Sequence, residues 1–298
     1  MKQRHSNDKE LEEFLTVGII QTNVDYEMAW ENPELSLNMN RNAQEKAWFD
    51  IKKGFCNLNN VYHRPQIIVL PELTVPHGYV EDLKILSKAV GAVVIAGVDF
   101  EEQTERKVRN KAVITIPENW PDINTSDIKK SKRASSVFFG KTFFSNDEEE
   151  FFRHFKPPFE KFPDPVSYIL DAGKFGEIGV AICSDFFDIE RFVIYRGRIH
   201  HMIVISYNQD VNSYYFLAEA ISRLVYCNVV ICNTGHYGDS LVFSPYKESH
   251  RRIIYRHEGK NLFTTQIVKL PVSDLDSAQR REDTKKLFKS PPPGYQKS

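Results

Sequence analysis

Short apolar runs alternate with amphipathic stretches along most of the chain. The apolar runs are strand-sized and rich in β-branched residues, which predicts buried strands; they cover residues 14–22, 67–70, 92–98, 110–116, 176–182, 202–206 and 229–232. Between them, residues 43–59, 81–90 and 214–228 place apolar side chains at helical spacing. This alternation of helices and strands predicts an α/β protein, and two or three closing strands follow through Leu270.

Other parts of the chain depart from this alternation. Val137 to Phe144 and Phe151 to Phe155 predict two strands, separated by an acidic turn at Asn146 to Glu150. We therefore divide the chain into an N-terminal extension (1–13), a core domain (14–275) with a polar, partly basic excursion (117–136), and a charged, Pro-rich tail (276–298). The tail has no core of its own and is expected to be disordered or to lie across a partner.

Composition narrows the possible partners and compartment. The 298 residues carry 39 Lys and Arg against 40 Asp and Glu, a net charge of -1, so no overall field attracts nucleic acid or an anionic membrane. The first residues lack the apolar stretch of a secretory signal, and four cysteines without paired spacing fit a reducing compartment. We expect a cytoplasmic protein that binds neither nucleic acid nor membrane.

Three reactive side chains follow predicted strands. Glu72 stands near the end of IIVLPEL, Cys183 ends GVAIC, and Lys156 stands with Glu160 in RHFKPPFE. A thiol that attacks a carbonyl or nitrile carbon needs a base for its proton and a positive group near the developing oxyanion. Glutamate, lysine and cysteine together are sufficient for acyl transfer through a thioester.

These motifs resemble those of the nitrilase, or carbon-nitrogen hydrolase, superfamily, and the resemblance covers about Val17 to Leu270. IVLPELTVPHGY and GEIGVAICSDFFD are similar to the family's base and nucleophile motifs, and SRLVYCNVVICNTGHYGDSLVFSP follows the order of its later elements. The resemblance implies a four-layer α-β-β-α sandwich, commonly a homodimer. It also implies that Glu72 is the general base, Cys183 the nucleophile and Asp185 a supporting residue.

The lysine motif is irregular. PPFE fits its second half, with Glu160 as the second glutamate, but the usual family spacing from Glu160 leads back to Arg153. We place the lysine at Lys156 and keep Arg153 and Lys141 as alternatives, since Lys141 lies in FFGKTFF with Glu148 and Glu149 behind it. An arginine in this position would put catalytic competence in doubt, because its larger guanidinium is permanently charged.

The sequence thus predicts a thiol hydrolase of the nitrilase or amidase type that cleaves a small amide, carbamoyl compound or nitrile. The alternatives are a catalytically silent nitrilase-fold module that binds a ligand or partner, and an acyl or amidyl transferase that uses the same thioester. His77, Asn208 and His236 are expected to line the substrate pocket. No histidine has metal-ligand spacing, so we expect neither metal nor organic cofactor. Apolar residues among the arginines of Ile189 to His201 predict a homodimer interface.

Overall fold

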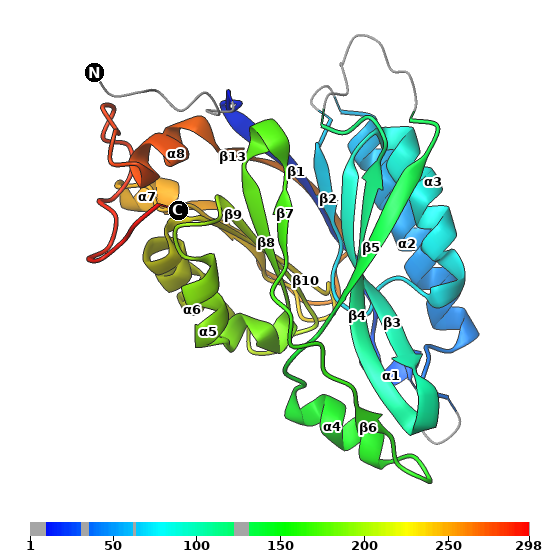
Figure 1. Ribbon diagram of the computed structural model, residues 1–298. Helices are drawn as coiled ribbons and strands as arrows, with labels where there is room; N and C mark the ends of the chain where they lie inside the picture. The colour runs from blue at the N-terminus through cyan, green and yellow to red at the C-terminus, as the bar shows by residue number, and fades with distance from the viewer. Residues whose placement is uncertain (1–9, 31–35, 62–63, 122–130, 298) are drawn as a thin grey trace.

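Two β-sheets stack face to face, and helices cover the outer face of each (Figure 1). The computed structural model describes residues 10–30, 36–61, 64–121 and 131–297. In this part of the chain, the first sheet has the order β13-β1-β2-β3-β4-β5 with β6 paired to β4, and the second has the order β12-β11-β10-β9-β8-β7. The fold is therefore the α-β-β-α sandwich that the sequence predicts.

The elements have the following bounds. The first sheet contains β1 (Phe14–Gln21), β2 (Ile67–Val69), β3 (Val93–Glu102), β4 (Lys107–Pro117), β5 (Ala134–Gly140), β6 (Glu160–Lys161) and β13 (Thr264–Pro271). The second contains β7 (Ile169–Asp171), β8 (Glu177–Ile182), β9 (His201–Ser206), β10 (Asn228–Asn233), β11 (Ser240–Phe243) and β12 (Ile253–His257). The helices are α1 (Tyr26–Ala29), α2 (Arg41–Asn59), α3 (Val80–Val90), α4 (Asn146–Arg153), α5 (Ile189–Tyr195), α6 (Val211–Ile221), α7 (Ser249–Arg252) and α8 (Ser273–Gln279).

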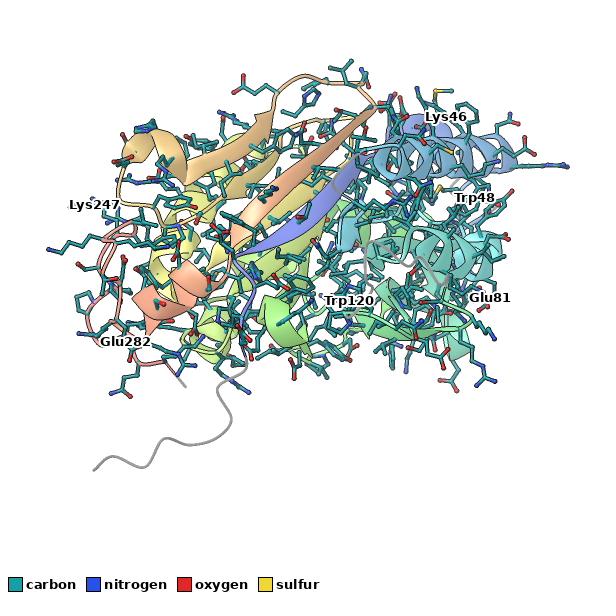
Figure 2. All side chains as sticks on the ribbon, turned by 90° about the horizontal axis from the view of Figure 1, so that it is seen from above. Lys46, Trp48, Glu81, Trp120, Lys247 and Glu282 are labelled. Carbon is teal, nitrogen blue, oxygen red and sulfur yellow. The ribbon has the colours of Figure 1, made fainter. Side chains whose placement is uncertain are left out.

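Strand β2 in the middle of the first sheet is apolar throughout because both faces of the sheet are covered there. Along β2, Ile67 and Val69 face the core between the sheets, whereas Ile68 packs with Ile51 of α2 and Leu83 of α3. Seen from above, these two helices, marked by Trp48 and Glu81, lie on one side of the molecule, and the C-terminal segments lie on the other (Figure 2). None of the described helices is long and apolar enough to cross a bilayer.

Residues 146–153 form the helix α4, where the sequence pattern predicted an acidic turn and the start of a strand. Ser145 caps this helix: its side chain accepts a hydrogen bond from the Glu148 N–H, and the Glu148 carboxylate accepts one from the Ser145 N–H. This reciprocal capping box and the acidic first turn stabilise the helix N-terminus. The apolar residues Phe151 and Phe152 then lie on the buried side of a helix instead of alternating along a strand.

The C-terminal tail packs against its own chain. Phe288 and Tyr295 are buried with Tyr226, Tyr246 and Leu275 in a separate apolar cluster. The expectation of a disordered or partner-bound tail is therefore wrong for residues 276–297, because two aromatic side chains supply the apolar area that its charged composition concealed. Residues 122–130 of the polar, partly basic excursion lie outside the described residues.

The segment predicted to form a dimer interface, which includes α5, contains both buried and exposed apolar side chains. Tyr195 and Ile199 are fully buried within the subunit, so they are not available for an interface. Ile189 and Val193, in contrast, are 75% and 71% exposed, and Phe216 on the neighbouring α6 is 67% exposed. Helices α5 and α6 cover the outer face of the second sheet (Figure 1), and these exposed residues place apolar side chains on the surface of that layer.

Candidate active site

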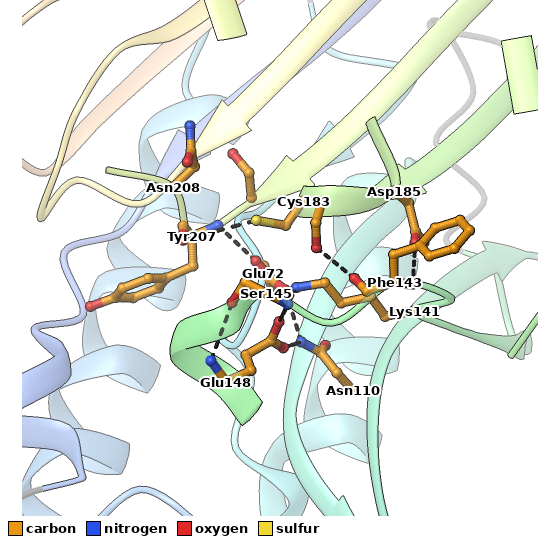
Figure 3. A network of polar contacts seen from close by, with 12 residues as sticks. Glu72, Asn110, Lys141, Phe143, Ser145, Glu148, Cys183, Asp185, Tyr207 and Asn208 are labelled. Carbon is orange, nitrogen blue, oxygen red and sulfur yellow. Dashed lines mark hydrogen bonds and ion pairs between the residues drawn. The ribbon is translucent and has the colours of Figure 1, made fainter. Parts of the chain in front are cut away.

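A cavity of about 550 Å³ lies where the ends of several strands meet, and Glu72, Lys141, Glu148 and Cys183 all line it. Glu72 follows β2, Lys141 follows β5, and Cys183 follows β8. The predicted base and nucleophile therefore reach one cavity from opposite sheets (Figure 3).

The backbone of β3 holds Glu72 in place. Gly97 accepts hydrogen bonds from the N–H groups of Thr74 and Val75 and donates one to the carbonyl of Pro71. This approach is so close that a Cβ on Gly97 would stand 2.3 Å from the Glu72 Cα atom, which requires glycine at position 97. The position of Glu72 is thus fixed by main-chain contacts on both sides.

Lys141 bridges two carboxylates. Its Nζ atom lies 2.7 Å from Glu72 Oε1 and 2.6 Å from Glu148 Oε2, and its side chain is only 1% exposed. The Asn110 amide donates to the same two groups, at 2.8 Å from Glu72 Oε1 and 2.7 Å from Glu148 Oε1. The Tyr207 N–H donates to the remaining Glu72 oxygen at 2.8 Å. Every carboxylate oxygen of this buried network therefore has a donor (Figure 3).

The charge of Lys141 is set by these neighbours. Burial alone disfavours an ammonium ion, but the Glu148 and Glu72 carboxylates outweigh it and hold the pKa of Lys141 well above its ordinary value. Lys141 is therefore a permanent positive charge next to Glu72 at neutral pH.

Cys183 occupies a sharp turn at the end of β8. Its φ angle is 46°, a left-handed conformation that is costly for a residue with a side chain and that is often found at functional sites. The Tyr214 hydroxyl lies 3.4 Å from the Cys183 sulfur, and the Tyr207 carbonyl oxygen lies 4.0 Å from it. The sulfur and the Glu72 carboxylate thus both contact the main chain of Tyr207.

Cys183 is a protonated thiol in this environment. Burial, and after it the Glu72 carboxylate, raise the pKa of Cys183 to about 12, while the Lys141 ammonium and the Tyr214 hydroxyl act in the opposite direction. Nucleophilic attack by this sulfur therefore requires that its proton be transferred to a base as the new bond forms.

Asp185 connects the turn of Cys183 to the segment that follows Lys141. Its carboxylate accepts hydrogen bonds from the N–H groups of Thr142 and Phe143 at 3.0 and 2.8 Å, and it lies 3.5 Å from the Arg191 guanidinium. The Ser184 hydroxyl also donates to the Phe143 carbonyl. These bonds hold the lysine-bearing and cysteine-bearing segments together, and a supporting role of Asp185 in a reaction stays a prediction.

The lysine and second glutamate of the site are not the predicted pair. Lys156 and Glu160 are both exposed and line no part of this cavity, and Arg153 is an exposed residue of α4 that pairs with Glu149. The alternative, Lys141, lies against Glu72 together with Glu148. Glu148, in the first turn of the helix 146–153, is the second glutamate of the site. The PPFE segment comes after this helix in the chain and does not form the site.

Two sequence signals could have found this pair. The seven-residue separation that led from Glu160 back to Arg153 also separates Glu148 from Lys141. In addition, Ser145 followed by Glu148 is the sequence pattern of a capping box, which predicts a helix start at this point.

Of the three predicted pocket residues, Asn208 lines the cavity and the two histidines do not. His77 is exposed, and its ring nitrogen lies 2.7 Å from the Phe100 carbonyl oxygen. His236 packs behind the wall, against the rings of Tyr207 and Tyr237. Within the described ranges, no group of three or more His, Cys, Asp or Glu side chains is placed to hold a metal ion.

Solved structures with similar folds were found, whereas no protein-family model and no curated protein matches the sequence. Nit3 of Saccharomyces cerevisiae, a member of branch 10 of the nitrilase superfamily, has a TM-score of 0.62 at 16% identity over 93% of this chain and 97% of its own. XC1258 of Xanthomonas campestris is a CN-hydrolase superfamily protein with an arsenic adduct in its active site. Its TM-score is 0.59 at 12% identity, over 91% of this chain and 95% of its own.

A third similar structure is a variant of the amidase from Nesterenkonia sp. AN1, in which the acetamide moiety of fluoroacetamide is covalently added to the active-site cysteine. Its TM-score is 0.59 at 12% identity, with 90% of this chain and 95% of that chain covered. All three neighbours cover nearly the full chain. The protein therefore has the fold of the nitrilase, or carbon-nitrogen hydrolase, superfamily, as its sequence motifs predict.

Proposed function

We propose that this protein is a carbon-nitrogen hydrolase that cleaves a small amide, carbamoyl compound or nitrile through a thioester on Cys183. The observation that carries this proposal is the buried network in which Lys141 bridges Glu72 and Glu148 in the cavity that Cys183 also lines. A charged network of this kind is costly to bury, and a structural role alone does not require a nucleophile beside it.

In the first half of the reaction, Glu72 takes the proton of the Cys183 thiol as the sulfur attacks the substrate carbon. Lys141 and the N–H of Ser184 stabilise the negative charge that develops on the substrate oxygen, or on the nitrogen of a nitrile. For an amide, Glu72 then returns the proton to the leaving nitrogen, the carbon-nitrogen bond breaks, and a thioester remains on Cys183.

In the second half, Glu72 takes a proton from water, and the resulting hydroxide attacks the thioester carbon. The carbon-sulfur bond breaks, the carboxylic acid leaves, and the sulfur regains its proton from Glu72. Glu148 does not exchange protons in this scheme. It fixes Lys141 beside Glu72 through the bonds of Lys141, Asn110 and Ser145 to its carboxylate.

Fluoroacetamide tests the nucleophile. After incubation with it, intact-mass measurement and peptide mapping should show the acetamide moiety on Cys183 and none on Cys56, which is exposed on α2 and serves as an internal control. The adduct should be absent from Cys183→Ala and strongly reduced in Glu72→Gln. Ammonia release from a panel of small amides then measures turnover.

The two other function classes give different results in the same experiments. A catalytically silent module forms no adduct on Cys183 and releases no ammonia from any amide or nitrile. A transferase forms the thioester but releases the acyl group faster when a primary amine is added, and mass analysis of the product shows an amide in place of an acid.

We also propose that the protein forms a homodimer through α5 and α6. The exposed apolar side chains of Ile189, Val193 and Phe216 support this, since a twofold axis through the patch would bury the same residues of both copies.

A further inference from the structure

The cavity has a ring of carboxylates that the proposed reaction does not use. Asp147 and Glu150 of α4 line it, as does Asp210 at the start of α6. None of these three carboxylates has an ion-pair partner in the described part of the chain, whereas the Lys141 ammonium is already shared by Glu72 and Glu148. The cavity therefore carries excess negative charge beside its nucleophile.

Helix stability does not explain why these carboxylates face the cavity. Acidic residues in the first turn stabilise α4 whichever way they point, and Glu149 in the same turn points away: it pairs with Lys161 and Arg153 at a separate surface. Asp147 and Glu150, on the opposite side of the helix, face the cavity.

Aromatic rings form the wall next to these carboxylates. Tyr26, Trp30, Tyr207 and Tyr237 all line the cavity. The ring centres of Tyr26 and Trp30 are 5.5 Å apart, those of Tyr26 and Tyr207 are 6.4 Å apart, and those of Tyr207 and Tyr237 are 5.5 Å apart. The faces of such rings attract cations, most strongly where water is partly excluded.

The ionisation of Tyr26 is consistent with a negative potential at this wall. Burial is the largest effect, and Asp147 and the Tyr237 hydroxyl add to it, which together raise the pKa of Tyr26 to about 12. A further negative charge is thus disfavoured here.

We propose that the substrate is an amide or carbamoyl compound with a cationic group at its far end, an amine or a guanidinium, held between Asp147 and Glu150 and the rings of Tyr26, Trp30, Tyr207 and Tyr237. This inference rests on the proposed function, because that function places the bond to be cleaved at Cys183. The cavity volume of about 550 Å³ is sufficient for a short chain between the two ends.

Three probes of similar length and different end charge test the proposal. They are 5-aminopentanamide, hexanamide and the monoamide of adipic acid, which end in an ammonium, a methyl and a carboxylate group. Ammonia release should give kcat/KM in that order, with at least about a tenfold preference for the ammonium over the methyl end. Equal values, or a preference for hexanamide, would overturn the proposal.

Variants then assign the preference to the cavity carboxylates. The double variant Asp147→Asn, Glu150→Gln should reduce the ratio of kcat/KM for 5-aminopentanamide over hexanamide by about tenfold or more. Glu149→Gln removes the same charge from the same helix turn on its other side, and it should keep the ratio of the unchanged protein. A double variant that also keeps the ratio would contradict the assignment.

A binding measurement separates failure of this inference from failure of the proposed function. If no probe is hydrolysed, calorimetry with Cys183→Ala still compares the binding of 5-aminopentanamide and hexanamide. Selective binding of the former that weakens with added salt supports the cationic ligand while the hydrolase proposal fails. Binding of 5-aminopentanamide no tighter than that of hexanamide overturns the inference.

Discussion

Replacement of Lys141 by Met is the most direct test of the buried network. Methionine fills most of the space of the lysine stem but removes the ammonium that contacts Glu72 and Glu148. Removal of one partner from a buried ion pair costs about 3–5 kcal/mol of unfolding free energy. We expect about 3 kcal/mol at pH 8, because Asn110 continues to donate to both carboxylates.

The loss should be present throughout the neutral pH range. In the unchanged protein the pKa of Lys141 is raised, so its contribution is complete below the ordinary lysine value and stays constant between pH 6 and 8. Lys141→Met should therefore be less stable than the unchanged protein at both ends of this range.

Urea unfolding followed by tryptophan fluorescence at pH 6 and pH 8 measures this loss. The deficit of Lys141→Met should be present at both pH values, and the variant should form no fluoroacetamide adduct. The control is Lys156→Met, which alters an exposed lysine and should change stability by less than about 0.5 kcal/mol. The reasoning is refuted if Lys141→Met is as stable as the unchanged protein at both pH values, or if Lys156→Met loses the adduct.

Three further changes have defined outcomes. Tyr214→Phe removes a hydrogen bond that lowers the pKa of Cys183, so labelling of this thiol by iodoacetamide at pH 9 should slow several-fold relative to Cys56, and an unchanged ratio would contradict that role. Ser145→Ala removes the cap of α4 and should cost about 1 kcal/mol in urea unfolding; no measurable loss would mean that packing alone holds the helix. Val193→Asp places a charge in the exposed apolar patch and should give monomers in analytical ultracentrifugation, a prediction that fails if the unchanged protein is already monomeric.

The sequence predicted those parts of the fold and site that depend on local patterns. Fully buried strands produce continuous apolar runs. A residue that directly follows such a run, like Glu72 or Cys183, must lie at the C-terminal end of a strand. The two strands are far apart in the chain and in different sheets. The prediction that Glu72 and Cys183 belong to one site came from the resemblance to a family, and not from the local pattern.

The lysine was assigned to the wrong segment because residues 151–155 were interpreted as a strand, whereas 151–153 are the last residues of the helix α4. Lys141 reaches Glu72 through contacts between residues 69 positions apart. Propensity rules describe neighbours along the chain, and the acidic run 147–150 is compatible with an exposed turn as well as a helix start. The capping hydrogen bonds of Ser145 decide between them.

The close contact between Gly97 and Glu72 makes one side of the cavity less tolerant of substitution than the other. Main-chain hydrogen bonds join the segment that carries Glu72 to Gly97 of β3. A substitution at Gly97 or in that segment would therefore displace the proposed base before it altered the pocket. Helix α4 contributes side chains to the same cavity from an exposed surface. Selection for new substrates, in nature or in a laboratory library, should therefore accumulate changes at positions 147 and 150 and leave position 97 as glycine.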